Sequence, residues 1–245
     1  MKKVIIIALV LFVIGISGVI YTLRTTGVNQ FYTLAHKQVE LNQPTRTIAI
    51  DSPDTDIIVK PSDGNVVTAE LKASKESRGK LYKVEILEED GQLKVEVMRK
   101  DPYSFNIGVL FYRERVEVSL PHKVYDAIRI TSNVADIKLE DIESKSTLVS
   151  VQTGDIHLIG TEFAGDCRLE TAKGDVEVKF ERFPESLKVD FKSETGKGEV
   201  DLTGIHFLEK SDHRLLGQSG TGEHVLRVNT TSGGFHLSMV TKGEN

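Results

Sequence analysis

The sequence predicts an all-β protein, in which a parallel, solenoid-like β-repeat domain follows a single transmembrane helix. Three observations support this fold class. The chain opens with a long uncharged segment, apolar residues recur at every second position from residue 47 onward, and a β-strand repeat begins after residue 127. A period of two is the side-chain period of a strand. At 245 residues the chain is also long enough to bury a substantial core.

The first element is a predicted membrane anchor within residues 1–24. The 20 residues 4–23 carry no charge and lie between Lys3 and Arg24. A helix of this length spans about 30 Å, which matches the hydrocarbon core of a bilayer. Lysines before the segment favour a cytoplasmic N-terminus, so the protein is expected in the cell membrane with its C-terminal domain outside the cytoplasm. A cleaved secretory signal is the alternative, although the apolar stretch is long for that role.

The next elements follow from composition and alternation. Residues 25–46 are mixed and polar, and they are interpreted as a linker or stalk. Residues 47–240 are expected to form the β-repeat domain, with a β-rich portion at 47–127 and the repeats at 128–240. Residues 241–245 are treated as a tail.

Each repeat has two short strand patterns joined by a Gly-Asp corner or a near equivalent. The apolar residues that follow the corners are Ile137, Ile156, Val176, Val200 and Phe235. The first repeats are about 20 residues long, which leaves no room for a crossover helix between their strands. A parallel β-solenoid with one coil per repeat fits the pattern, as does an antiparallel sandwich or meander in which the corner closes a hairpin. The repeated corner favours the solenoid, because stacking places equivalent corners above one another.

The acidic residues at the corners are candidates for a cation-binding column. In stacked coils they would lie about 4.8 Å apart, where like charges repel unless water, lysine or a cation such as calcium intervenes. The alternative is a purely structural corner, in which glycine adopts positive φ and a short acidic side chain accepts bonds from nearby amides. The candidates are Asp136, Asp155, Asp175 and Glu199.

The pattern also resembles a known family. Val116–Pro121 and Ile128–Ile130, followed by the Gly-Asp repeats, resemble the bacterial "putative adhesin" family of β-strand-repeat proteins, whose domain has no assigned function. With an N-terminal anchor, the chain is similar to the LiaG-like envelope proteins of Gram-positive bacteria. The resemblance implies a right-handed solenoid-like body, a link to envelope stress and no catalytic residues. Ala135 departs from the corner glycine and puts the first coil in doubt, and residues 206–224 are an insertion.

Residues that could carry chemistry do not form a recognised motif. His157 and His236 occupy the same repeat position and should project into solvent. Residues 217–222 lack the complete nucleophile-elbow and phosphate-loop patterns and are interpreted as a flexible loop. Cys167 is the single cysteine, which excludes an internal disulfide and a multi-thiolate zinc cluster. No catalytic residue and no cofactor is therefore assigned.

The favoured function is non-enzymatic. A net charge of −5 argues against a nucleic-acid partner. We expect a single-pass, extracytoplasmic β-repeat protein that acts in envelope stress response or surface interaction, with the membrane and an envelope protein as partners. One alternative is an adhesin that binds cell-wall polymer or a host surface, and a second is a polysaccharide hydrolase or lyase. The aromatic segment 103–112 is interpreted as core or as a solenoid cap, and if exposed it would contact lipid or a partner.

Overall fold

The computed structural model describes residues 31–41, 45–73, 82–100, 114–160 and 163–240. Within these ranges the chain forms strands and no helix, which confirms the all-β class. No helix in the described part of the chain is long and apolar enough to cross a membrane. The predicted anchor and the aromatic segment 103–112 both lie outside the described residues.

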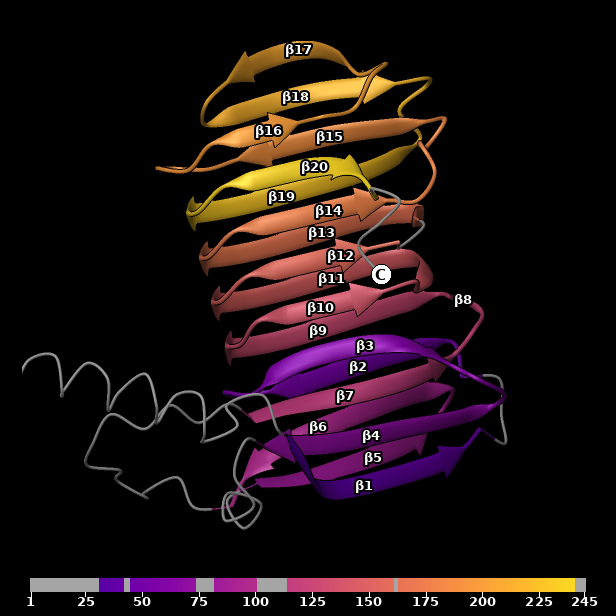
Figure 1. Ribbon diagram of the computed structural model, residues 1–245. Helices are drawn as coiled ribbons and strands as arrows, with labels where there is room; N and C mark the ends of the chain where they lie inside the picture. Colours follow the sequence, from indigo (N-terminus) through magenta and orange to yellow (C-terminus); the bar gives the residue numbers. More distant parts are fainter. Residues whose placement is uncertain (1–30, 42–44, 74–81, 101–113, 161–162, 241–245) are drawn as a thin grey trace, which may run out of the picture.

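The strands form two facing sheets that run the length of the molecule (Figure 1). The nine-stranded sheet, here sheet A, has the order β1 (Tyr32–Glu40), β4 (Val66–Ala73), β7 (Glu114–Pro121), β3 (Asp56–Ser62), β10 (Ile137–Glu140), β12 (Ile156–Ile159), β14 (Val176–Phe180), β20 (Phe235–Met239) and β16 (Gly198–Val200). The eleven-stranded sheet, here sheet B, has the order β17 (His206–Ser211), β18 (Arg214–Ser219), β15 (Leu187–Lys192), β19 (His224–Ser232), β13 (Phe163–Lys173), β11 (Glu143–Thr153), β9 (Ala127–Val134), β2 (Thr47–Ser52), β6 (Gln92–Arg99) and β5 (Tyr82–Glu89), and β8 (Val124–Tyr125) pairs with β11.

The strand pairing fits the predicted parallel solenoid. In each coil a strand of sheet B leads to a strand of sheet A, and equivalent strands of neighbouring coils pair in parallel, as β9, β11 and β13 do. Antiparallel pairs occur towards the two ends, where β1, β4 and β7 close one end of sheet A and β15, β18 and β17 close one end of sheet B. The body is therefore a parallel stack with antiparallel ends.

The order of the coils in space differs from their order in the sequence. The β19–β20 coil lies between the β13–β14 and β15–β16 coils, because β19 pairs with both β13 and β15. At the other end, the β6–β7 coil lies outside the earlier β2–β3 coil. A solenoid with one coil per repeat would, in its simplest form, stack each coil against the next one in the sequence. Every copy carries the same alternation, so the pattern does not specify which copies pair.

The corner between the sheets has one length in six coils. Four residues separate Val151 from Ile156, and four separate their register partners Thr171 and Val176. The coil that departs at Ala135 keeps this spacing, since Ser132 pairs with Val151 and Ile137 with Ile156. The backbone of Ala135 does not have positive φ, so this corner forms without glycine. The departure at Ala135 does not interrupt the coil.

The core lies between the sheets and consists of the inward-facing residue of each alternating pair. Ile130, Val149 and Leu169 are register neighbours on successive strands and have no exposed surface. Burying such a side chain contributes about 1.5–3 kcal/mol. Towards the C-terminal end, the rings of Phe191 and Phe235 stack with their centroids 5.3 Å apart. The core is thus one column along the solenoid axis.

Part of the expected linker is a strand. Residues 25–46 were interpreted as a stalk, but Tyr32–Glu40 forms β1 and pairs with β4 along its length. The register shifts between Thr33 and Ala35, so a bulge interrupts the period of two that would identify a strand. The strand also lies at a sheet edge, and its residues are largely exposed or half-buried, which weakens the apolar signal.

The insertion at 206–224 forms a hairpin of β17 and β18 over the end of sheet B. β18 pairs antiparallel with β15 and continues the sheet beyond the last coil. Residues 217–219, interpreted as part of a flexible loop, are the end of β18. The insertion therefore extends sheet B and is not a surface loop.

Candidate functional site

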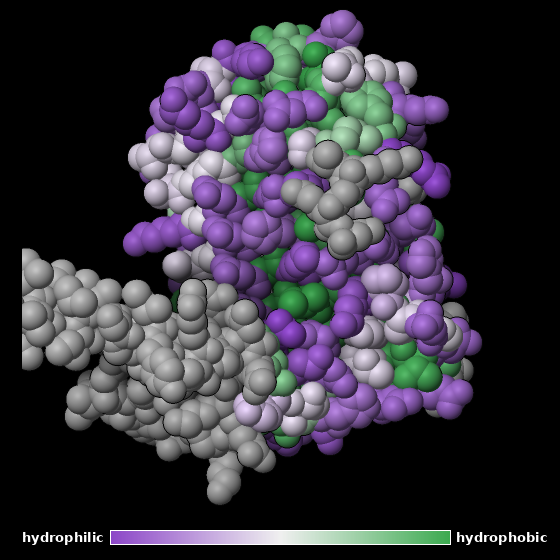
Figure 2. All heavy atoms as spheres, viewed as in Figure 1, coloured by the Kyte–Doolittle hydropathy of each residue, from purple (hydrophilic) through white to green (hydrophobic). Residues whose placement is uncertain are grey.

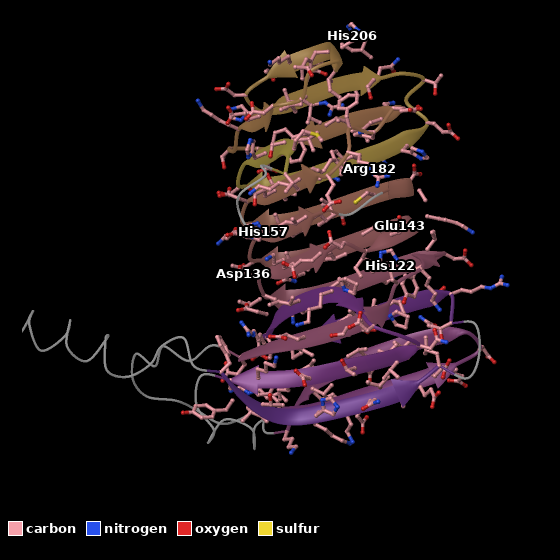
Figure 3. The ribbon with its side chains drawn as sticks, turned by 45° about the vertical axis from the view of Figure 1, so that its right-hand side comes forward. His122, Asp136, Glu143, His157, Arg182 and His206 are labelled. Carbon is pink, nitrogen blue, oxygen red and sulfur yellow. The ribbon has the colours of Figure 1, made fainter. Side chains whose placement is uncertain are left out.

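The corner carboxylates form a ladder along one side of the solenoid. Each accepts a backbone N–H from the corner residue of the next coil. Asp136 Oδ1 accepts from Asp155 at 3.0 Å, and Asp155 Oδ1 accepts from Asp175 at 2.7 Å. The ladder continues from Asp175 Oδ1 to the Gly234 N–H at 2.6 Å, and Asp56 Oδ1 begins it by accepting from Asp136 at 3.0 Å. Asp136 and His157 are labelled on neighbouring coils in Figure 3.

Glu199 lies outside this ladder. Its register partner is His236, two residues beyond the corner, and the Phe235 N–H bonds to the Lys197 carbonyl. The corner glycine of this coil is Gly196, since a Cβ there would lie 1.6 Å from the Gly233 oxygen. The structure thus brings Asp136, Asp155 and Asp175 together and leaves Glu199 apart.

In the corner ladder, backbone amides bond to the carboxylates that were the candidates for binding a cation. Each amide donor satisfies one carboxylate oxygen, so these oxygens already have hydrogen-bond partners within the fold. Within the described ranges no group of three or more His, Cys, Asp or Glu side chains is arranged to hold a metal ion. The geometry assigns the corner carboxylates a structural contact, which is the bond between neighbouring coils.

The corner ladder predicts that Asp155 matters as a hydrogen-bond acceptor and not as a charge. Asp155→Asn keeps an oxygen that can accept the Asp175 N–H, so it should change the free energy of unfolding by less than about 0.5 kcal/mol. Asp155→Ala removes the acceptor and should cost about 1–2 kcal/mol. Urea denaturation with and without calcium measures both effects. A calcium-dependent rise in melting temperature that Asp155→Asn abolishes would instead support the cation column.

A second cluster lies on the outer face of sheet A. His157 Nδ1 lies 3.2 Å from Glu177 Oε2, and His236 Nε2 lies 3.0 Å from Asp201 Oδ2. Burial raises the pKa of Glu177, but hydrogen bonds from Lys179 and His157 outweigh it and leave the pKa below its ordinary value. The two histidines, predicted to project outward, are half-buried in this charged network. Glu177 occupies the same repeat position on β14 and lies between them, because it is the register partner of both histidines.

Among the residues that the structure describes, the most buried charge is Glu117 on β7, which sequence reasoning missed. Its side chain is 6% exposed, and its oxygens lie 2.7 Å from Lys72, 3.1 Å from Lys60 and 2.7 Å from Arg115. Burial raises the pKa of Glu117, but the hydrogen bonds from Lys72 and Lys60 lower it more, so the net shift is downward. Its one sequence signal is an acid between Val116 and Val118 in an apolar strand.

Glu117 should make stability depend on pH. Because its folded-state pKa is lowered, its contribution is present above the ordinary pKa of 4.5 and is lost as pH falls through the folded-state value. Glu117→Gln should cost about 2 kcal/mol at neutral pH, and the difference from wild type should shrink in acid. Glu199→Gln, at an exposed position, is the control and should cost less than about 0.5 kcal/mol. Equal pH profiles for the two variants would contradict this role.

The alternative of a polysaccharide hydrolase or lyase needs paired carboxylates, for which Asp166, Asp175 and Asp190 are the sequence candidates, and the structure separates these three. Asp175 lies in the corner ladder, whereas Asp166 on β13 accepts the Val225 N–H at 3.3 Å. Asp190 on β15 is held by Arg214 and Arg227. The three side chains therefore serve different contacts and do not converge on one site.

The chain is similar to a known protein family and to solved structures. A family model described as Toastrack DUF4097 matches residues 45–179 and 126–238. A crystal structure described as a putative cell adhesion protein from Clostridium sporogenes is similar at a TM-score of 0.62 and 16% identity, covering 86% of this chain and 99% of that chain. A crystal structure described as a putative adhesin from Bacteroides fragilis has a TM-score of 0.31 and 7% identity, covering 86% of this chain and 98% of that chain. A search of curated proteins finds no match.

Proposed function

The chain belongs to the Toastrack DUF4097 family, and from this premise we propose that it is a non-enzymatic binding protein on the outer side of the cell membrane. The resemblance to the β-strand-repeat family of adhesin-like proteins is confirmed. In the proposal, residues 4–23 anchor the chain, and the solenoid contacts a protein of the envelope. In the proposal the contact serves envelope stress response or surface interaction, and the resemblance to LiaG-like envelope proteins supports the link to envelope stress.

The observation that carries this proposal is the charge of the outer face of sheet A. Over β3, β10, β12, β14, β20 and β16 and their corners, carboxylates outnumber cationic side chains. The carboxylates are Asp54, Asp56, Asp136, Glu140, Asp155, Asp175, Glu177, Glu194, Glu199 and Asp201, which directly follows β16, and the cations are Lys60, Lys138, Lys173, Lys179 and Lys197. Hydrophilic residues predominate on the side of the molecule seen in Figure 2, with hydrophobic residues between them.

A face of this charge favours a basic partner surface. Charge complementarity steers association and suppresses wrong partners, and it weakens as salt increases. The parallel strands hold these side chains at a regular spacing along the solenoid, so a partner can contact several coils at once. We therefore place the partner contact on the outer face of sheet A.

The partner contact is tested by charge reversal in the full-length chain. Glu140→Lys with Glu199→Lys reverses two charges on this face, and Glu185→Lys with Glu223→Lys reverses two exposed charges in loops that precede β15 and β19. Crosslinking in intact cells, followed by affinity purification, should recover one membrane protein with wild type and the control pair but not with the first pair. Equal recovery with both pairs, or no specific partner with wild type, would refute the proposed contact.

The location is tested separately. Alkaline phosphatase fused after Asn245 should be active, because the enzyme folds only outside the cytoplasm. A fluorescent protein that matures only in the cytoplasm, fused at the same position, is the control and should stay dark. Bright fluorescence with inactive phosphatase would place the domain inside the cell and contradict the proposal.

A further inference from the structure

The outer face of sheet B carries a surplus of positive charge, on the side of the solenoid opposite the acidic outer face of sheet A. With Lys173 counted at its corner, cationic side chains outnumber carboxylates six to four in β9, β11, β13, β19 and β15. Each of these five strands contributes at least one cation, and β18 beyond them adds Arg214 and no carboxylate. We call this surface the basic face. Its cations are Arg129, Lys145, Arg168, Lys188, Lys192 and Arg227.

Half of these cations are not neutralised by carboxylates of the chain itself. Arg129, Lys188 and Lys192 form no ion pair within the described ranges, and Arg129 and Lys192 are exposed. Arg168 and Arg227, in contrast, are paired with carboxylates on their own or the neighbouring strand. A partner that places carboxylates opposite the unpaired cations would therefore form contacts that the free chain does not make.

The basic face and the acidic face of sheet A are carried by the same coils. β9, β11, β13, β19 and β15 belong to the coils of β10, β12, β14, β20 and β16 on the other side (Figure 1). Towards the N-terminal end the positive surplus stops, since β5 and β6 hold four carboxylates and three cationic side chains. Neighbouring strands of either face lie about 4.8 Å apart. The two faces therefore match each other in length and spacing, with opposite charge.

The pattern of the basic face fits a surface of mixed charge better than a uniform polyanion. Asp166, Glu170 and Asp190 lie among its cations, and they would repel a chain of closely spaced phosphates or sulfates. The acidic face is mixed in the opposite sense, because Lys138 and Lys179 lie among its carboxylates. Each face thus presents a minority of the charges that the other face can pair.

We propose that a second copy of the chain docks with its basic face on the acidic face of sheet A. This inference rests on the proposed function, because it names the partner of the sheet A contact and uses the proposed membrane anchor. A sideways shift without rotation brings the two faces together. It leaves both solenoid axes pointing the same way, as two chains anchored in one membrane require. Each copy keeps one unused face, so the contact is heterologous and can extend into a row.

The size of the two faces makes the contact weak between free molecules. Strands of about five residues, stacked over five coils, present about 400 Å² on each copy. A standard interface buries about 800 Å² per partner. Exposed ion pairs contribute up to about 1 kcal/mol each and weaken as salt increases. Anchoring both chains in one membrane raises their effective concentration, so we expect the contact in the membrane and not in dilute solution.

The test is crosslinking between two differently tagged full-length chains that are expressed together in one membrane. One chain carries Ser238→Cys on β20 of sheet A, the other carries Ser150→Cys on β11 of sheet B, and a bismaleimide of about 10 Å reach joins them. The mixed product should exceed the product of two Ser238→Cys chains, or of two Ser150→Cys chains, about tenfold, because like faces repel. Wild type gives the background, since burial raises the pKa of the Cys167 thiol and makes it unreactive.

Charge reversal tests whether the basic face carries the contact. Arg129→Glu with Lys192→Glu, in the Ser150→Cys chain, should lower the mixed product about fivefold or more. Neither side chain has an ion pair to lose, so the melting temperature should not change. Arg46→Glu with Lys37→Glu, at exposed positions outside the basic face, is the matched control and should leave the mixed product unchanged.

Three results would overturn the second copy as the partner. The first is no mixed product above the wild-type background, and the second is like-face products as abundant as the mixed one. The third is a mixed product that the charge reversal on the basic face leaves unchanged. If the purification described above then recovers a different membrane protein, the sheet A contact stands and only this inference fails. Active fluorescent protein at the C-terminus would instead overturn the proposed location, and with it the proposed function.

Discussion

Gly174→Ala is expected to lower the free energy of unfolding by about 3 kcal/mol or more. Gly174 has φ of +146°, and a Cβ at this position would lie 2.0 Å from the Gly154 carbonyl oxygen of the neighbouring coil. That backbone is held in place, because the Gly154 N–H bonds to the Lys173 carbonyl at 2.8 Å. Relief of the clash therefore requires two coils to move apart at the corner. Urea denaturation followed by circular dichroism measures the loss.

A second glycine separates the clash from the backbone strain. Gly64 has φ of +83°, but no atom lies within 4 Å of its Cβ position. Gly64→Ala should therefore show strain alone and cost about 1 kcal/mol. If both variants lose the same stability, the close approach of the coils at Gly174 contributes nothing, and the stacking of the corners would be wrong.

Phe191→Ala is expected to cost about 3–5 kcal/mol, the range for removing a buried aromatic ring. Phe191 has no exposed surface and stacks on Phe235 at 5.3 Å. It also fills the space beside Gly198, where a Cβ would lie 2.6 Å from its ring. The ring thus joins the β15–β16 and β19–β20 coils, and its loss leaves a cavity between them.

The control for this prediction is Phe183→Ala. Phe183 is 37% exposed and lies in the loop before β15, so its loss should cost less than about 1 kcal/mol. Thermal unfolding of both variants beside wild type gives the comparison. A Phe191→Ala protein as stable as Phe183→Ala would contradict the placement of this ring in the core.

The coils were predictable from local pattern, and their order was not. Ile137, Ile156 and Val176 were identified as the residues after successive corners, and they are parallel register partners. Alternation defines which face of a strand is buried but not which strand lies beside it. The position of β19–β20 depends on contacts between residues far apart in the sequence, such as Cys167 and Leu226. A single sequence contains no signal for that choice.

Of the polar clusters, the corner ladder was predictable from the sequence and the Glu117 cluster was not. The corner ladder follows from a fixed spacing, and this gave Asp136, Asp155 and Asp175. The Glu117 cluster depends on Lys60 and Lys72, which lie 57 and 45 residues away and meet it only after β3, β4 and β7 pair. Glu199 was misplaced because a Gly-acid pair also follows Gly196, and the pattern could not show which glycine forms the corner.

The β19–β20 coil also constrains how the chain can be assembled as it is synthesised. If the polypeptide emerges from its N-terminus, β15 and β16 are delivered before the strands that lie between them and β13–β14. The solenoid therefore cannot form by adding each newly synthesised coil to the end of the stack. Residues 187–200 must wait, or be displaced, until residues 224–239 arrive and take the intervening place. A product that terminates before residue 224 would thus expose open sheet edges, which are surfaces for aggregation and proteolysis.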